Sequence, residues 1–226
     1  MDTVIKVGGS LTDNPENLRL LCHKLAELAK KNSFIVVPGG GRFADLVREF
    51  DNCFALSCNV SHRMAVLAMD QLGFLLSNIT PNSHVFYLLE NAEQLSVAGM
   101  VPIFLPSRLM FEEDPLENSW DVTSDSIAAY VANRVHAGKL VLVTDVDGVY
   151  TSNPRVDSDA TLISKLSAEQ LQTMNRRTSV DRYLPGLLLD AQINCYVVNG
   201  LFPERVEAIM AGLRTTCTFV ASKSIQ

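Results

Sequence analysis

A lysine and two glycines follow the first apolar run of the chain, in the segment Lys6-Val7-Gly8-Gly9-Ser10. Glycines at the end of a buried strand let the backbone approach a ligand closely. Successive backbone N–H groups in such a turn form a concave site for anions, and Lys6 adds a positive charge beside it. The segment therefore indicates a phosphate-binding turn, although a tight turn with a solvated lysine would show the same residues.

A second glycine turn follows the next apolar run, in the segment Pro38-Gly39-Gly40-Gly41-Arg42-Phe43. The three glycines lead into a predicted helix, and a helix N-terminus attracts negative charge. Arg42 can hold a phosphate or carboxylate with two parallel hydrogen bonds. A flexible loop with a surface arginine is the alternative, but two glycine-rich strand ends in neighbouring units favour an anion-binding site.

Two further segments place polar side chains at the ends of predicted elements. The first, which precedes a helix, is Asp121-Val122-Thr123-Ser124-Asp125-Ser126. One of its residues is expected to cap that helix, which leaves several polar side chains unexplained. The second, which follows a buried strand, is Val143-Thr144-Asp145-Val146-Asp147-Gly148-Val149-Tyr150. An aspartate there can orient a lysine or hold Mg²⁺ near phosphates, but Asp-Gly is also a common turn.

Strands that alternate with helices are expected to position these segments. Short apolar runs, several of them β-branched throughout, predict strands buried on both faces at residues 4–7, 34–37, 85–89, 101–105, 140–144, 196–198 and 218–220. Apolar residues at helical spacing predict helices at residues 15–31, 43–50, 61–76, 125–136 and 203–210. Residues 105–120 and 150–165 are predicted to be loops. This order predicts an α/β fold whose mostly parallel sheet binds ligands at the carboxyl ends of its strands.

The composition is typical of a globular domain. The 226 residues are 47% hydrophobic and 19% charged, which allows a large core. A net charge of −6 argues against nucleic acid as a partner, although a few local cations can still hold a phosphorylated small molecule. Five scattered cysteines without a CxxC pair predict neither a disulfide framework nor a zinc site. Without a signal peptide or an 18-residue apolar run, we expect a cytoplasmic protein that crosses no membrane.

The order of four segments resembles the amino acid kinase superfamily, namely KVGGS, PGGGRFAD, DVTSDSIAA and TDVDGVYTSNP. The resemblance extends from Lys6 to about Thr218, and its most specific part is Val146-Asp147-Gly148-Val149-Tyr150 followed by Pro154. It implies a three-layer α/β/α sandwich with a mostly parallel eight-stranded sheet, formed by residues 1–226 as one domain. An acceptor-binding lobe would comprise residues 1 to about 120, and a nucleotide-binding lobe the rest. The resemblance also implies ATP, Mg²⁺ and a homodimer or larger homo-oligomer.

The same resemblance implies roles for individual residues. Lys6 would hold the transferred phosphoryl group, and Asp145 would orient Lys6. Phosphates and nucleotide would contact Gly8, Gly9, Ser10, Asp147, Gly148, Val149, Tyr150 and Pro154. The acceptor would contact Gly39, Gly40, Gly41, Arg42, Thr123 and Asp125. In-line transfer of the γ-phosphoryl group needs no side-chain nucleophile, and we expect no dedicated metal ligands because Mg²⁺ binds mostly phosphate and water.

One segment departs from the superfamily pattern. Many members carry a Gly-Gly-Met turn followed by a second lysine that binds phosphate. The aligned residues 179–190 keep Gly186 but contain no lysine. The charge on the leaving group would then be neutralised by Lys165, Arg182 or Mg²⁺.

A helical segment narrows the resemblance further. Together with the missing lysine and the short chain, Ser61-His62-Arg63-Met64-Ala65-Val66-Leu67-Ala68-Met69-Asp70 is most similar to the kinases of methanofuran biosynthesis. Those kinases convert [5-(aminomethyl)furan-3-yl]methyl phosphate to the diphosphate. His62 and Arg63 would then lie in the acceptor pocket, and Arg63 would converge with Arg42 on the acceptor phosphate.

Three alternatives remain open at the level of the sequence. His62 could lie on a helix surface, and the methionines of the segment could serve only as core packing. The chain could be a uridylate kinase, which shares the fold. It could also be a nucleotide-binding regulator or storage protein that transfers no phosphate.

Overall fold

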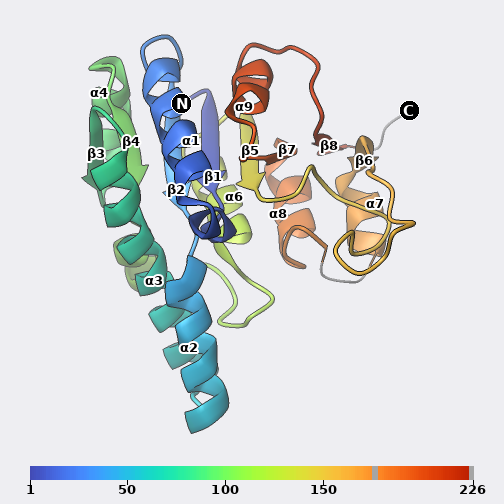
Figure 1. The fold of residues 1–226 in the computed structure, drawn as a ribbon. Coiled ribbons are helices and arrows are strands. Elements are labelled where there is room, and N and C mark those ends of the chain that lie inside the picture. Colours follow the sequence, from blue (N-terminus) through green and yellow to red (C-terminus); the bar gives the residue numbers. More distant parts are fainter. Residues whose placement is uncertain (175–177, 224–226) are drawn as a thin grey trace.

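One eight-stranded sheet runs through the computed structural model, which describes residues 1–174 and 178–223 (Figure 1). Its strands are β1 (Thr3–Val7), β2 (Phe34–Pro38), β3 (Ser83–Phe86), β4 (Val101–Phe104), β5 (Lys139–Thr144), β6 (Lys165–Ser167), β7 (Asn194–Asn199) and β8 (Thr218–Ala221). They lie in the order β3-β4-β2-β1-β5-β7-β8-β6. Every neighbouring pair is parallel except β7 and β8. The predicted mostly parallel sheet is confirmed, and β1, which carries Lys6, lies near its centre.

Helices cover both faces of the sheet, so the predicted three-layer sandwich is also confirmed (Figure 1). They are α1 (Pro15–Leu28), α2 (Gly41–Phe54), α3 (Cys58–Ile79), α4 (Ala92–Val97), α5 (Ser107–Glu113), α6 (Ser124–Arg134), α7 (Ala168–Thr173), α8 (Leu184–Ala191) and α9 (Pro203–Met210). Two short 3₁₀ turns, η1 (Gly9–Asp13) and η2 (Leu89–Asn91), complete the described elements. Helices α1 and α9 pack on one face, while α6 and α8 pack on the other. No helix in the described ranges is long and apolar enough to cross a membrane.

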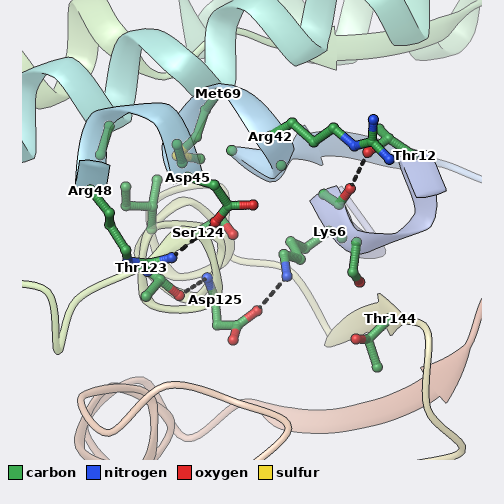
Figure 2. Close-up of a pocket in the computed structure, with 18 of the residues that line it drawn as sticks. Lys6, Thr12, Arg42, Asp45, Arg48, Met69, Thr123, Ser124, Asp125 and Thr144 are labelled. Carbon is green, nitrogen blue, oxygen red and sulfur yellow. Dashed lines mark hydrogen bonds and ion pairs between the residues drawn. The ribbon is translucent and has the colours of Figure 1, made fainter. Parts of the chain in front are cut away.

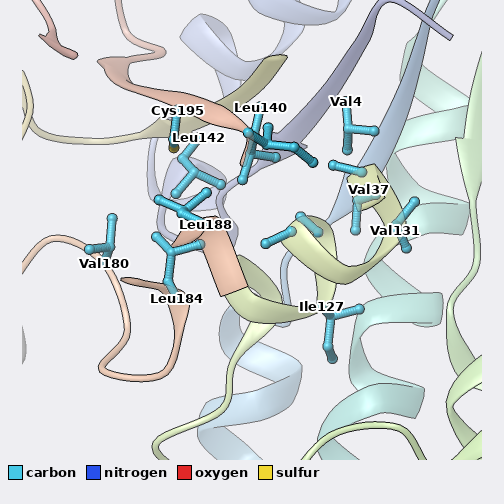
Figure 3. Packing of buried hydrophobic residues seen from close by; sticks show 14 of the residues in the cluster. Val4, Val37, Ile127, Val131, Leu140, Leu142, Val180, Leu184, Leu188 and Cys195 are labelled. Carbon is cyan, nitrogen blue, oxygen red and sulfur yellow. The ribbon is translucent and has the colours of Figure 1, made fainter. Parts of the chain in front are cut away.

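The core consists of two apolar layers, one on each face of the sheet. In β5, Leu140 and Leu142 point into the layer of α6 and α8, whereas Val141 and Val143 point into the layer of α1 and α9. All four side chains are at most 1% exposed. Figure 3 shows the first layer, where leucines of β5 meet side chains of α6 and α8. Burial on both faces explains why the central strands are apolar throughout and do not alternate with polar residues.

Several elements differ from the sequence prediction. The predicted strand at 85–89 lies earlier, as β3, where Ser83 pairs with Val101 in parallel register. The predicted loop 105–120 contains α5, because the backbone N–H and hydroxyl of Ser107 donate to the buried carboxylate of Asp70 on α3. Strand β6 and helices α4, α7 and α8 were not predicted, since each is short and is stabilised mainly by contacts with distant parts of the chain.

Candidate active site

The two glycine turns contact each other at the carboxyl ends of β1 and β2. Gly8 N donates to Val143 O at 2.7 Å, and Gly39 N donates to Val7 O at 2.8 Å, which anchors each turn to a neighbouring strand. A Cβ atom on Gly9 would overlap the backbone nitrogen and Cα of Gly41. A Cβ on Gly39 would lie 2.6 Å from Gly9 N. The turns can therefore approach this closely only because these positions carry no side chain.

Lys6 pairs with Asp125 directly beside these turns. Lys6 Nζ lies 2.8 Å from Asp125 Oδ1, and the two side chains are only 11% and 8% exposed (Figure 2). Asp125 lies in the first turn of α6, whose N-cap is Thr123, and α6 packs against β1. Asp145, which was predicted to orient Lys6, forms an ion pair with Arg155. The carboxylate that holds Lys6 therefore comes from a helix N-terminus and not from the end of β5.

A cavity of about 400 Å³, here called the Lys6 pocket, opens between the glycine turns, α2, α3 and the N-terminus of α6 (Figure 2). Of the residues predicted for the site, it is lined by Lys6, Gly8, Gly9, Ser10, Gly40, Gly41, Arg42, His62, Thr123 and Asp125. Other lining residues, among them Arg48 and Trp120, were not singled out by the sequence analysis. The structure thus brings the first three predicted segments together around one cavity.

A second cavity, of about 480 Å³, is here called the Tyr150 pocket. The predicted residues Asp145, Gly148, Tyr150 and Pro154 line it, together with Ser10. Four residues border both cavities, namely Ser10, Thr144, Arg155 and Ser179. The two pockets therefore meet beside the end of β5, close enough to share a wall of hydroxyl groups and one guanidinium.

Comparison with known proteins is consistent with this geometry. The model of the amino acid kinase family matches residues 1–184. The chain belongs to the amino acid kinase family. It is 34% identical to the [5-(aminomethyl)furan-3-yl]methyl phosphate kinase of Methanocaldococcus jannaschii, over 92% of this chain and 93% of that protein. It is 27% identical to the uridylate kinase of Methanococcus maripaludis, over 94% and 96% of the two chains.

A solved structure gives the same result for the fold. The crystal structure of uridylate kinase from Archaeoglobus fulgidus superposes with a TM-score of 0.78 at 25% identity, covering 98% of this chain and all of that one. Family and relatives together identify the present chain as an ATP-dependent kinase of small molecules.

Six residues predicted for the site line neither pocket of this kinase: Gly39, Arg63, Asp147, Val149, Lys165 and Arg182. Gly39 serves the contact between the turns, as described above. The carboxylate of Asp147 accepts from Asn199 and Arg205, at 2.9 and 2.6 Å. Val149 is buried and its N–H donates to Thr218. Lys165 is exposed on the edge strand β6, and Arg182 lies beside Asp121 at a third cavity.

The predicted convergence of Arg42 and Arg63 on one anion is wrong. Arg42 is 78% exposed and pairs with Asp13 at 2.9 Å, at the end of the pocket near Thr12 (Figure 2). Arg63 points away, and its guanidinium lies over the ring of Phe111. On α3, His62 takes the position that faces the pocket, so the next residue, Arg63, points in another direction.

Arg48 supplies a further cation to the Lys6 pocket. Its guanidinium lies 4.5 Å from the ring centroid of Trp120, and Nη1 lies 3.3 Å from Asp45 Oδ1. Trp120 is held in turn by Asp51, which accepts from the indole N–H at 2.7 Å. Arg48 lies seven residues after Gly41 on α2, so the two positions share a helix face. That spacing was the sequence signal that could have identified it.

His62 contributes less charge to the pocket than its residue type suggests. Burial lowers the pKa of His62, an effect that outweighs the opposing influence of Asp114. The neutral imidazole is therefore favoured near pH 7 in the absence of a ligand. In the Lys6 pocket the permanent positive charges come from Lys6, Arg42, Arg48 and Arg155.

Proposed function

We propose that this kinase transfers the γ-phosphoryl group of ATP to a phosphomonoester and releases a diphosphate, with [5-(aminomethyl)furan-3-yl]methyl phosphate as the acceptor. The observation that carries the proposal is the shared wall of the two pockets, beside the Lys6–Asp125 pair. A donor in one pocket and an acceptor in the other would place their phosphates on either side of this wall. Such an arrangement suits in-line transfer, which depends on positioning and on neutralising charge.

ATP is proposed to occupy the Tyr150 pocket and the acceptor the Lys6 pocket. The Tyr150 pocket is built mostly from residues 144–155 and 178–179, which belong to the proposed nucleotide-binding lobe. The Lys6 pocket takes most of its wall from β1, the glycine turns, α2 and α3, which belong to the proposed acceptor-binding lobe. The 1–120 and 121–226 lobes are thus proposed to meet at Thr123, Ser124 and Asp125, which complete the acceptor side.

The transferred phosphoryl group is proposed to bind Lys6 and the backbone of Gly8 and Gly9. Asp125 holds the Lys6 ammonium in place. Arg155 is the guanidinium on the wall shared by both pockets, and we assign to it the charge of the second lysine that the chain lacks. Lys165 and Arg182, the earlier candidates for this charge, lie away from that wall.

Mg²⁺ is proposed to accompany ATP and to shield its phosphate charges. Within residues 1–174 and 178–223, no three histidine, cysteine or acidic side chains gather as a metal site. The Tyr150 pocket nevertheless offers the carboxylate of Asp145 and, at 3.3 Å from it, the hydroxyl of Thr144. These are the hard oxygen donors that Mg²⁺ prefers, and in ATP sites the ion keeps most of its ligands from phosphate and water. The residues therefore fit a magnesium–nucleotide complex.

The acceptor class is supported by the chemistry of the Lys6 pocket. Arg48 offers a guanidinium for the acceptor phosphate, and Val66, Met69 and Trp120 offer an apolar wall for a ring. Asp45 offers a carboxylate to a positively charged group such as an aminomethyl group. A molecule with a phosphate, a small ring and an ammonium group would use all three.

A coupled ADP-release assay over a panel of acceptors tests the proposal. The panel contains [5-(aminomethyl)furan-3-yl]methyl phosphate, UMP, glutamate and aspartate, each with ATP and Mg²⁺. The furan phosphate is expected to give the highest kcat/KM. A higher value for UMP would make the chain a uridylate kinase, and a higher value for an amino acid would exclude a phosphate acceptor. Binding of ATP without turnover on any acceptor would favour a nucleotide-binding regulator.

We also propose that the kinase acts as a homodimer in the cytoplasm. Val60, Leu67 and Phe74 on α3 are 44%, 44% and 52% exposed, and their spacing of seven residues places them in one stripe. A two-fold axis near Leu67 would bring the Val60 end of one copy to the Phe74 end of the other, so the stripe is self-complementary. The described cysteines are unpaired, which suits a reducing compartment.

A further inference from the structure

The carboxylate of Asp181 is buried and accepts five hydrogen bonds. Oδ2 accepts from Thr123 N, Thr123 Oγ1 and Ser126 N, at 2.9, 2.9 and 3.0 Å. Oδ1 accepts from Ser126 Oγ and Leu184 N, at 2.7 and 2.8 Å. The residue is only 3% exposed, and three of the donors are backbone N–H groups. Asp181 therefore ties the start of α6 to the start of α8, two helices that are distant in sequence.

The backbone of Asp181 reaches the Lys6–Asp125 pair directly. Asp181 N donates to Asp125 Oδ2 at 3.2 Å, while Asp125 Oδ1 faces Lys6 Nζ. Each oxygen of Asp125 thus has its own partner, and Asp181 fixes the orientation that presents Oδ1 to Lys6. Ser179, two residues before Asp181, borders both pockets. The same anchor therefore holds part of the wall between them.

Burying a carboxylate so completely is costly unless its hydrogen bonds offset the loss of water. Burial raises the pKa of Asp181, and the nearby charge of Asp125 raises it further, whereas the hydrogen bonds from Ser126 and Thr123 lower it. Only the ionised form can accept from all five donors at once. An apolar side chain could fill this space at lower cost, but it would leave three backbone N–H groups without acceptors.

We propose that Asp181 is a positioning residue for phosphoryl transfer, which holds Asp125, and through it Lys6, in the orientation needed at the wall between the two pockets. The inference rests on the proposed function. Asp181 lies in the stretch that replaces the superfamily's Gly-Gly-Met turn and lysine. It lines neither the Lys6 pocket nor the Tyr150 pocket. Its part in the reaction is indirect, through the geometry of the Lys6–Asp125 pair.

The test is Asp181→Asn in the full chain, assayed with ATP and the best acceptor of the panel. Asparagine keeps the volume and one acceptor oxygen, so the chain is expected to fold. Misplacing a catalytic group by about 1 Å can cost roughly 10²-fold, so kcat is expected to fall about 100-fold. The KM for ATP and its dissociation constant, measured by calorimetry, should change by no more than about threefold, because the ligand contacts remain.

Asp70→Asn is the matched control. Asp70, within α3, is also a buried carboxylate, and it accepts from Ser107 at the start of α5, but it lines neither pocket. Its variant should lower the melting temperature and leave kcat unchanged. Ser126→Ala removes one hydroxyl donor from Asp181 and should lower kcat less than Asp181→Asn does. If Asp181→Asn fails to fold, Ser126→Ala becomes the test of the inference. A wild-type kcat in Ser126→Ala would then overturn it.

Two other outcomes separate this inference from the proposed function. If the wild-type chain is active and folded Asp181→Asn has its full kcat, or if Asp70→Asn loses as much kcat, Asp181 is structural only and the function stands. If the wild-type chain transfers phosphate to no acceptor of the panel, both the function and the inference are wrong.

Discussion

The ammonium group of Lys6 lies 2.8 Å from the carboxylate of Asp125, and both are almost fully buried beside the two glycine turns. Lys6 lies one residue before the end of the central strand β1, whereas Asp125 is the second residue of α6, which packs against that strand. A buried ion pair of this kind contributes little net stability, because both charges lose their water. Its value here lies in fixing a cation at a defined place on the pocket wall.

Replacing Lys6 with methionine is expected to lower kcat by about 10²–10³, because one positioned charge that stabilises the transition state is lost. The variant should also unfold more easily, by roughly 3–5 kcal/mol, because Asp125 is left as an unpaired buried charge. Turnover by the ADP-release assay and urea unfolding measure the two effects separately.

The double variant Lys6→Met/Asp125→Asn distinguishes the two roles. Removing both charges should restore most of the stability but none of the activity. A double variant as unstable as Lys6→Met would show that the loss comes from packing, and wild-type turnover in either variant would exclude Lys6 from the reaction.

Gly9→Ala should separate the two glycine turns. The added methyl group overlaps the backbone of Gly41, which cannot move aside as a flexible side chain would. We expect a fall in kcat of about tenfold or more together with a higher KM for both substrates, because the turns border the site of transfer. Gly186→Ala is the control, since its Cβ would meet open space. Equal kcat and KM values in the two variants would mean that the contact between the turns has no role in phosphoryl transfer.

Arg155→Met should lower kcat and raise the KM for ATP, because Arg155 is proposed to neutralise phosphate charge where the pockets meet. One removed charge–phosphate contact is expected to cost about 10²-fold in kcat/KM. Lys165→Met, on the edge strand and away from both pockets, is the control and should keep wild-type kinetics. If Lys165→Met lowers kcat/KM and Arg155→Met does not, Lys165 and not Arg155 neutralises the phosphate charge in place of the missing lysine.

The stability of the free enzyme should depend on pH through His62. Because burial lowers the pKa of His62 in the folded state, the unfolded chain takes up a proton first as the pH falls below 6.5, the ordinary value for histidine. The wild-type free energy of unfolding should therefore decrease relative to His62→Gln below pH 6.5 and run parallel to it above. Urea unfolding at several pH values checks this, and parallel curves throughout would show that His62 titrates normally.

Leu67→Glu should weaken the proposed dimer. A carboxylate at the centre of the α3 stripe would face its own copy across the two-fold axis, where like charges repel and an apolar contact is lost. Light scattering after gel filtration should show a shift towards monomer at micromolar concentration. Leu213→Glu is the control, because Leu213 is 67% exposed and lies outside α2 and α3. A monomeric wild-type chain would exclude the dimer.

Much of the site could be predicted from local sequence. The two glycine turns, the Thr123–Asp125 segment and the residues after β5 each follow a strand or precede a helix, and parallel strands bring such ends to one edge of a sheet. Strands buried on both faces could also be predicted, because they appear in the sequence as continuous runs of apolar residues. The resemblance to amino acid kinases supplied the number of strands and the chemistry.

Partners within the site were decided only by the tertiary structure. No local pattern shows that Lys6 pairs with Asp125 and not with Asp145, because the choice depends on how α6 packs against β1. Arginine is a residue type that often binds anions, yet the position of Arg63 on α3 places its guanidinium over the ring of Phe111. Asp181 gave no signal at all, since its five donors come from two helix starts that meet only when the chain is folded. Sequence periodicity determines which segments reach the edge of the sheet, whereas the direction of each side chain there depends on packing between segments far apart in the chain.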